Sequence, residues 1–128
     1  MKRRSLVLAL LLLASSGCGK FGFDGTVTIP EDEPFAQVEF RPPGEEKKAT
    51  LAVSAGEPVA VYVVLGDDMD EAVTRLRGGK EPRRVLARGS AAKESALEVT
   101  LPAKRGFLVF LSRGEKGTRE VGVKLSLK

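Results

Sequence analysis

Apolar and polar residues alternate in several short runs of this chain, and a period of two residues is typical of strands with one solvated face. The alternating runs are residues 36–41, 49–54, 96–101 and 120–128. Two more runs, 59–65 and 107–111, are apolar at almost every position. Such runs suit strands that are buried on both faces, so we expect these two at the centre of a sheet. A short run at 84–87 adds a seventh expected strand.

One segment has a helical period instead. Over residues 68–77, four apolar residues fall on a single helix face, namely Met69, Ala72, Val73 and Leu76. Acidic residues come before arginines along this segment, which suits the helix dipole, and Gly78-Gly79 ends it. Turn residues separate the other runs at near-regular spacing. The pattern therefore predicts an all-β fold, a small antiparallel β-sandwich of about seven strands with one short helix.

The first 18 residues follow a different pattern. Three basic residues precede an unbroken apolar run, Leu6 to Ala14, which fits a signal peptide and is too short to span a bilayer. Small residues lead from this run to Cys18, the only cysteine of the chain. This arrangement resembles the lipobox of bacterial lipoproteins, although Ser15 stands where the lipobox usually has leucine. That difference leaves ordinary cleavage, with an unmodified Cys18, as the alternative.

The resemblance implies a lipid anchor. In lipoproteins the cysteine thiol is diacylglycerylated with fatty acids such as palmitate, and the cysteine becomes the first residue after cleavage. Gly19 stands where an aspartate would favour retention in the inner membrane, so the outer membrane is favoured in a Gram-negative organism. We expect a signal peptide at 1–17, a lipidated cysteine with a glycine-rich flexible tether at 18–33, and the sandwich domain at 34–128. Phe21 and Phe23 would either enter the lipid interface or dock on the domain.

Removing the leader changes the charge of the chain. The whole sequence has 21 basic and 17 acidic residues, net +4, and three of the basic residues are Lys2, Arg3 and Arg4. The remainder is therefore close to neutral, at net +1, which disfavours nucleic acid as a partner. The chain contains no histidine and no tryptophan. No disulfide can form within it, and we expect no cofactor.

Two short motifs suggest chemistry, but neither is complete. The acidic residues at 67, 68, 70 and 71 suggest calcium, yet they lack the glycine and the distant glutamate of an EF-hand loop, and the helix start explains them. Ser90 and Lys93 match the S-x-x-K motif of penicillin-binding enzymes, but S-D-N and K-T-G are absent. Without histidine, the usual base for a serine nucleophile is missing. We therefore expect neither a metal site nor an enzyme.

The most uneven feature is a basic segment in which Glu81 is the only acidic residue. Its six cations are Arg75, Arg77, Lys80, Arg83, Arg84 and Arg88. Such a segment would suit anionic lipid headgroups or an acidic protein partner of the cell envelope, and the alternative is a solvated loop. Sugar binding is disfavoured, because the sole tyrosine, Tyr62, falls inside an expected central strand.

The stretch from Val53 to Leu127 resembles the pre-peptidase C-terminal domains of bacterial secreted proteases. The likeness rests on Ala55-Gly56 before a buried strand, an acidic turn at 66–68 and a terminal hairpin. The aspartate-leucine-tyrosine and glycine-threonine-tyrosine runs of those domains are absent, so the likeness implies architecture and no site. The expected function is a lipid-anchored, non-catalytic binding or structural module of the cell envelope. A small secreted or periplasmic hydrolase or inhibitor is the alternative.

Overall fold

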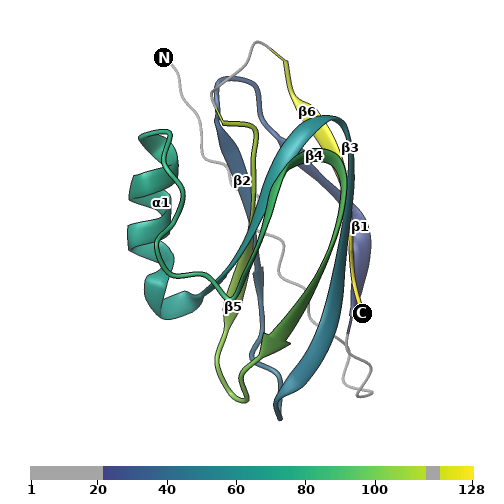
Figure 1. Cartoon of the computed structure of the whole chain (residues 1–128), viewed down its shortest axis with the longest axis vertical. Helices are drawn as coiled ribbons and strands as arrows, with labels where there is room; N and C mark the ends of the chain where they lie inside the picture. Colours follow the sequence, from purple (N-terminus) through teal and green to yellow (C-terminus); the bar gives the residue numbers. More distant parts are fainter. Residues whose placement is uncertain (1–21, 115–118) are drawn as a thin grey trace.

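The computed structural model describes residues 22–114 and 119–128, and within them it contains six strands and one α-helix (Figure 1). The strands are β1 (Phe23–Ile29), β2 (Phe35–Phe40), β3 (Lys47–Leu65), β4 (Ala87–Leu101), β5 (Phe107–Ser112) and β6 (Val121–Leu127). Helix α1 (Met69–Arg77) follows a single 3-10 turn, η1 (Gly66–Asp68). All the paired strands are antiparallel, which confirms the predicted all-β class with one short helix.

Strand β3 connects the two halves of the sandwich. Strand β4 pairs along one side of β3, while the other side pairs first with β6, over Leu51–Ala55, and then with β5, over Ala60–Leu65. Between these ladders the chain bends over at 56–58, where the register with β4 shifts. Pro58 suits this place because proline cannot donate a ladder hydrogen bond. The order β1-β6-β3-β5-β2, with β1 close to β2, gives a nearly closed sheet.

Two hydrophobic cores lie on opposite sides of the β2-β5-β3 part of the sheet. The larger one fills the interior and draws on all six strands. The smaller one lies outside, where Ala72 and Leu76 of α1 pack against Tyr62, Val64 and Phe110. Strand β5 and the second half of β3 are therefore buried on both faces, as their continuous apolar runs predict.

Two predicted strand boundaries are wrong. The runs at 49–54 and 59–65 belong to one continuous strand, because the bend at 56–58 keeps the chain beside β4 instead of ending the strand. No strand forms over 84–86; the strand after the helix begins at Ala87 and runs to Leu101. The amide of Leu86 donates to the Val63 carbonyl at 2.7 Å, which leads the loop into that ladder. Six strands result in the described residues.

Part of the expected tether is a strand. Residues 23–29 form β1, which pairs with β6 from Phe23 opposite Leu127 to Ile29 opposite Val121. The glycines at 22 and 25 hid this strand, whereas the alternation of Val27 and Ile29 with threonines is a strand signal. Phe23 docks on the domain, with its ring centroid 5.9 Å from that of Phe40. Phe21, Cys18 and the signal peptide lie outside the described residues.

The described part of the chain has no helix that is both long enough and apolar enough to cross a bilayer.

Candidate functional site

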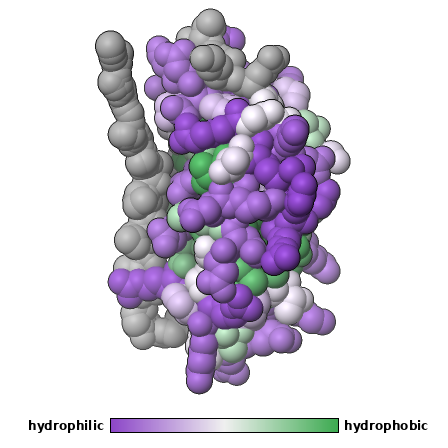
Figure 2. Space-filling model, turned by 90° about the vertical axis from the view of Figure 1, so that its left-hand side faces the viewer, coloured by the Kyte–Doolittle hydropathy of each residue, from purple (hydrophilic) through white to green (hydrophobic). Residues whose placement is uncertain are grey.

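The basic segment covers the end of α1 and the loop that leads to β4. Hydrophilic side chains dominate this face of the molecule, which Figure 2 presents to the viewer. The helix packs through Ala72 and Leu76, and its opposite side faces solvent. The fold thus places the six predicted cations along one side of the molecule.

Carboxylates contact five of the six cations. Glu71 forms ion pairs with Arg75 at 3.8 Å and with Arg83 at 3.9 Å, and Arg84 lies 3.9 Å from Asp68. Arg88 makes the closest pair, 2.6 Å from Glu81. The last pair is Arg77 with Glu33, at 3.9 Å. Among the six, only Lys80 has no carboxylate partner in the described residues.

Two of these arginines also have other contacts. The Arg75 Nε–H donates to the Glu81 carbonyl at 2.6 Å, and the Arg77 guanidinium lies 5.5 Å from the centre of the Phe35 ring. Such contacts hold the side chains against the protein. Because these ion pairs are solvent-exposed, each contributes at most about 1 kcal/mol to stability.

The pairing changes the charge of the segment. In the sequence, Glu81 is the only acidic residue inside it, but the fold brings in Glu33, Asp68 and Glu71. Opposite charges at these distances cancel much of the positive field that an anionic partner would meet. Binding at this segment stays a prediction.

The same kind of contact engages three of the four acids at the start of the helix. Asp67 binds Arg105 of the β4–β5 loop at 2.7 Å, while Asp68 and Glu71 pair with arginines of the basic segment. Within residues 22–114 and 119–128, no three acidic, histidine or cysteine side chains form a group that could hold a metal ion.

Ser90 and Lys93 lie on β4 where it bends beside β3. Three residues of strand span about 10 Å, so the serine and lysine are not brought together as they would be on one face of a helix. The motif therefore has no catalytic geometry here.

Tyr62 is buried beneath α1 and the loop after it. Burial raises the pKa of its hydroxyl above the ordinary value, Glu81 raises that pKa further, and Arg88 opposes both effects. The phenol is thus kept neutral, which suits a core residue.

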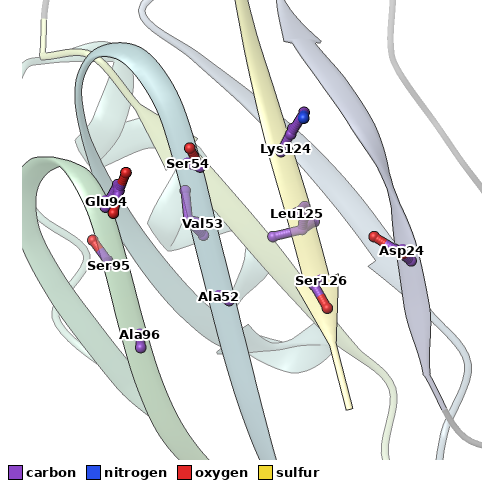
Figure 3. Close-up of a pocket in the computed structure, with 10 residues that line it drawn as sticks. All are labelled: Asp24, Ala52, Val53, Ser54, Glu94, Ser95, Ala96, Lys124, Leu125 and Ser126. Atoms are coloured by element: carbon purple, nitrogen blue, oxygen red, sulfur yellow. The ribbon is translucent and has the colours of Figure 1, made fainter.

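A hollow that the sequence analysis missed lies on the outer face of β4, β3, β6 and β1 (Figure 3). It is open to solvent and encloses about 610 Å³. The small side chains of Ala52, Ala96 and Ser126 meet across neighbouring strands and keep the sheet surface low. Asp24, Glu94 and Lys124 bring charge to the same area. The signal in the sequence is the small size of these three residues at outward-facing positions of neighbouring strands.

The sequence matches no protein-family model and no curated protein. Solved structures are similar in fold. The pre-peptidase C-terminal domain of a collagenase from Bacillus anthracis aligns with a TM-score of 0.54 and 13% identity, covering 93% of this chain and 92% of that one. This likeness shows a shared fold, and it confirms the architecture that the resemblance implied.

Two periplasmic inhibitors of g-type lysozyme also align over 93% of this chain, both with lower TM-scores. The Aeromonas hydrophila protein has a TM-score of 0.46, 14% identity and 94% of its own chain covered. The Salmonella Typhimurium protein has a TM-score of 0.48, 12% identity and 97% covered.

Proposed function

We propose that this chain is a lipid-anchored, non-catalytic binding or structural module of the bacterial cell envelope, held to the membrane through Cys18. The observation that carries the proposal is a single cysteine directly after a signal-peptide pattern. Two or more acyl chains on one cysteine give stable membrane attachment. Gly19 after the cysteine favours the outer membrane if the organism has one.

The arrangement of acidic side chains supports a non-catalytic role. A glycoside hydrolase that uses two carboxylates needs them about 5–10 Å apart around the scissile bond. In the hollow, Asp24 lies on β1 and Glu94 on β4, with β6 and β3 between them. Three strand spacings separate them by roughly 14 Å, which is too far for such a pair. Three of the four acids that the sequence singled out at the helix start, Asp67, Asp68 and Glu71, are engaged by arginines.

The proposed anchor is tested by changing Cys18 to Ser in the full-length chain and growing cells with a clickable fatty acid. The wild-type protein should carry the label and fractionate with membranes. The Cys18→Ser protein should be unlabelled and either unprocessed or soluble. A wild-type protein that is processed but unlabelled, found in the periplasm or medium, would contradict the anchor.

The proposed module also needs a partner, for which an envelope protein or anionic headgroups are the candidates. Cross-linking in intact cells with the lipidated protein, followed by identification of the cross-linked species, would distinguish them. A specific protein adduct that survives charge reversal of the basic segment would favour a partner bound elsewhere on the domain.

A further inference from the structure

Strand β4 forms an edge of the sheet. Within residues 22–114 and 119–128 it pairs only with β3, so no strand lies along its other side. The part of β4 after its bend keeps one register with β3, from Glu94 opposite Ser54 to Thr100 opposite Lys48. We call the open side of residues 94–101 the β4 edge.

The backbone groups that point to the β4 edge can be identified from the other side of β3. The Thr50 amide donates to the Lys128 carbonyl at 2.9 Å, and the Lys128 amide donates to the Thr50 carbonyl at 3.0 Å. Both polar groups of Thr50 therefore point away from β4. Glu98 lies opposite Thr50 at a non-bonded position of the β3–β4 ladder, so its own amide and carbonyl point away from β3.

The alternation extends this result along the strand. Residues two apart in a strand point the same way, so the residues in phase with Glu98 direct their amides and carbonyls to the β4 edge. These residues are Glu94, Ala96, Glu98 and Thr100. Among the described residues, no strand or loop pairs with this row of groups. An open row of this kind is a template for a further strand.

The same residues direct their side chains to the outer face of the sheet, where Figure 3 shows Glu94 and Ala96. Glu94 and Glu98 are exposed, and neither forms an ion pair in the part of the chain that the structure describes. Four residues of strand separate them by about 14 Å. The cations nearest along the pairing are Lys93, next to Glu94, and Lys48, on β3, and both leave the two carboxylates without a salt bridge.

On the inner face, the β4 edge leaves part of an apolar side chain accessible. Leu97 packs against the larger core but is only half-buried. A Cβ on Gly89 would lie 3.0 Å from Leu97 Cδ2, so Leu97 reaches the first half of β4 and closes the interior there. A strand added at the β4 edge would place its inner side chains beside Leu97, where apolar residues fit.

The carboxylates make β4 of a second copy a poor occupant. An antiparallel pair of β4 strands about a twofold axis aligns most of the open row only when the axis lies at residues 96–98. An axis at 96 puts Glu94 opposite Glu98 of the other copy, and an axis at 98 puts Glu98 opposite its own counterpart. An axis at 97 leaves these carboxylates diagonal to one another. Like charges directly opposite on neighbouring strands are destabilising.

From the open backbone row and the two carboxylates beside it, we infer that the β4 edge binds an extended segment of a protein partner by strand addition. The segment carries lysine or arginine opposite Glu94 and Glu98 and apolar residues beside Leu97. Its main chain supplies the missing hydrogen-bond partners, and its side chains set the specificity. This inference rests on the proposed role as a binding module and is independent of the anchor at Cys18.

A synthetic peptide is the probe. Its sequence is TVKVTVKVT, with blocked ends and a fluorophore, and its lysines have the spacing of Glu94 and Glu98 in either strand direction. The protein is the full-length chain as processed in cells, purified in a neutral detergent. Fluorescence anisotropy should show saturable binding. A peptide with glutamates in place of the lysines should bind about tenfold more weakly, since two attractive pairs become repulsive.

A proline tests the backbone row. Ala96→Pro removes an amide that points to the β4 edge and obstructs an added strand, while the bonds to β3 remain. It should weaken binding of the lysine peptide by about tenfold or more. The control, Ala96→Ser, keeps the amide and should bind like the wild type. Circular dichroism verifies that each variant is folded.

A charge exchange tests the carboxylates. Glu94→Lys with Glu98→Lys should reverse the preference, so that the glutamate peptide binds more tightly than the lysine peptide. The matched control is Glu31→Lys with Glu39→Lys. It changes the net charge equally at exposed positions, in the β1–β2 turn and on β2, and should keep the preference for the lysine peptide.

Three results would overturn the inference: no saturable binding of the lysine peptide, equal affinity of the wild type for both peptides, or equal affinity of the Ala96→Pro and Ala96→Ser proteins. A wild-type dimer in sedimentation velocity that Ala96→Pro abolishes would also overturn it, because a second copy would then occupy the edge. The fatty-acid label on the same protein tests the anchor separately. A labelled protein that fails to bind would overturn the inference alone, and an unlabelled protein that binds would overturn only the anchor.

Discussion

At the scale of single residues, Arg113 holds together two connections that are distant in the sequence. Its guanidinium donates to the carbonyls of Glu33 at 3.0 Å, Pro30 at 2.7 Å and Arg119. Its own amide donates to the Pro34 carbonyl at 2.9 Å. One half-buried cation thus donates to carbonyls of both the β1–β2 turn and the loop before β6.

Replacing Arg113 with Ala should lower the free energy of unfolding by about 1–3 kcal/mol, because partly buried carbonyls lose a charged donor. Arg105→Ala, which removes one exposed ion pair, should cost less than about 1 kcal/mol. Urea unfolding of both variants measures the difference. Equal losses of unfolding free energy in the two variants would show that Arg113 does not hold the two connections together.

Tyr62 provides a second test at this scale, because it is the only tyrosine and the chain has no tryptophan. The pKa of its hydroxyl is raised from the usual 10.0, by burial first and then by Glu81. The Tyr62 hydroxyl therefore loses its proton at a lower pH in the unfolded chain than in the folded one. Its contribution to stability is complete below pH 10 and is lost as the pH rises through the folded-state pKa.

Absorbance titration of tyrosinate should give a midpoint above 10 in buffer and a lower one in concentrated urea. Glu81→Gln should lower the folded midpoint, and Tyr62→Phe should abolish the signal. Identical midpoints in buffer and urea would show that the ring is not buried as described.

At the scale of elements, β1 shows how far the domain extends toward the N-terminus. It pairs with β6 over its whole length and closes the interior with Val27 and Ile29. Phe23 extends the stack that Phe40 makes with Phe107. The domain therefore includes residues 23–29.

A chain beginning at Gly19 should consequently be more stable than one beginning at Thr26, which lacks the start of β1. Truncating a buried Phe costs about 3–5 kcal/mol, and the half-buried Phe23 should account for a smaller loss. Thermal and urea unfolding of the two chains measures this. If the two chains proved equally stable, residues 23–25 would act as a tether and not as part of the domain.

At the scale of the whole molecule, charge pairs connect the acidic turn to distant parts of the chain. Asp67, Asp68 and Glu71 each contact an arginine from another part of the chain or from the helix. Four arginines, at 75, 83, 84 and 105, supply the compensating charge.

The melting temperature should therefore not change on adding EDTA or millimolar calcium, as differential scanning calorimetry would show. The described acids form no group able to hold an ion. A rise of several degrees in the melting temperature on adding calcium would show instead that the turn binds the ion.

The basic segment gives the second prediction at this scale. Reversing Arg83 and Arg84 to Glu should reduce the affinity of the untethered domain for anionic vesicles only slightly. The reason is that Arg83 and Arg84 face Glu71 and Asp68, which already compensate them. Vesicle co-sedimentation at low and physiological salt measures the affinity. A large loss at low salt that shrinks as the salt concentration rises would identify the basic segment as a lipid-binding surface.

The sequence by itself determined the class of fold and the helix. Strict alternation identifies a strand with one wet face, and runs such as 107–111 require cover on both sides, which the interior and α1 provide. The helix was predicted over 68–77 and extends over 69–77, because its apolar period and its glycine stop are local signals.

Only the tertiary structure decided which segments meet. The bend that makes β3 one strand depends on β4 running beside it, and glycines concealed β1 until β6 gave it a partner. In the sequence only Glu81 opposes the basic segment, because Glu33, Asp68 and Glu71 lie outside it. Local patterns report which face of an element is apolar, whereas charge compensation and the meeting of chain ends depend on contacts between residues far apart in the chain.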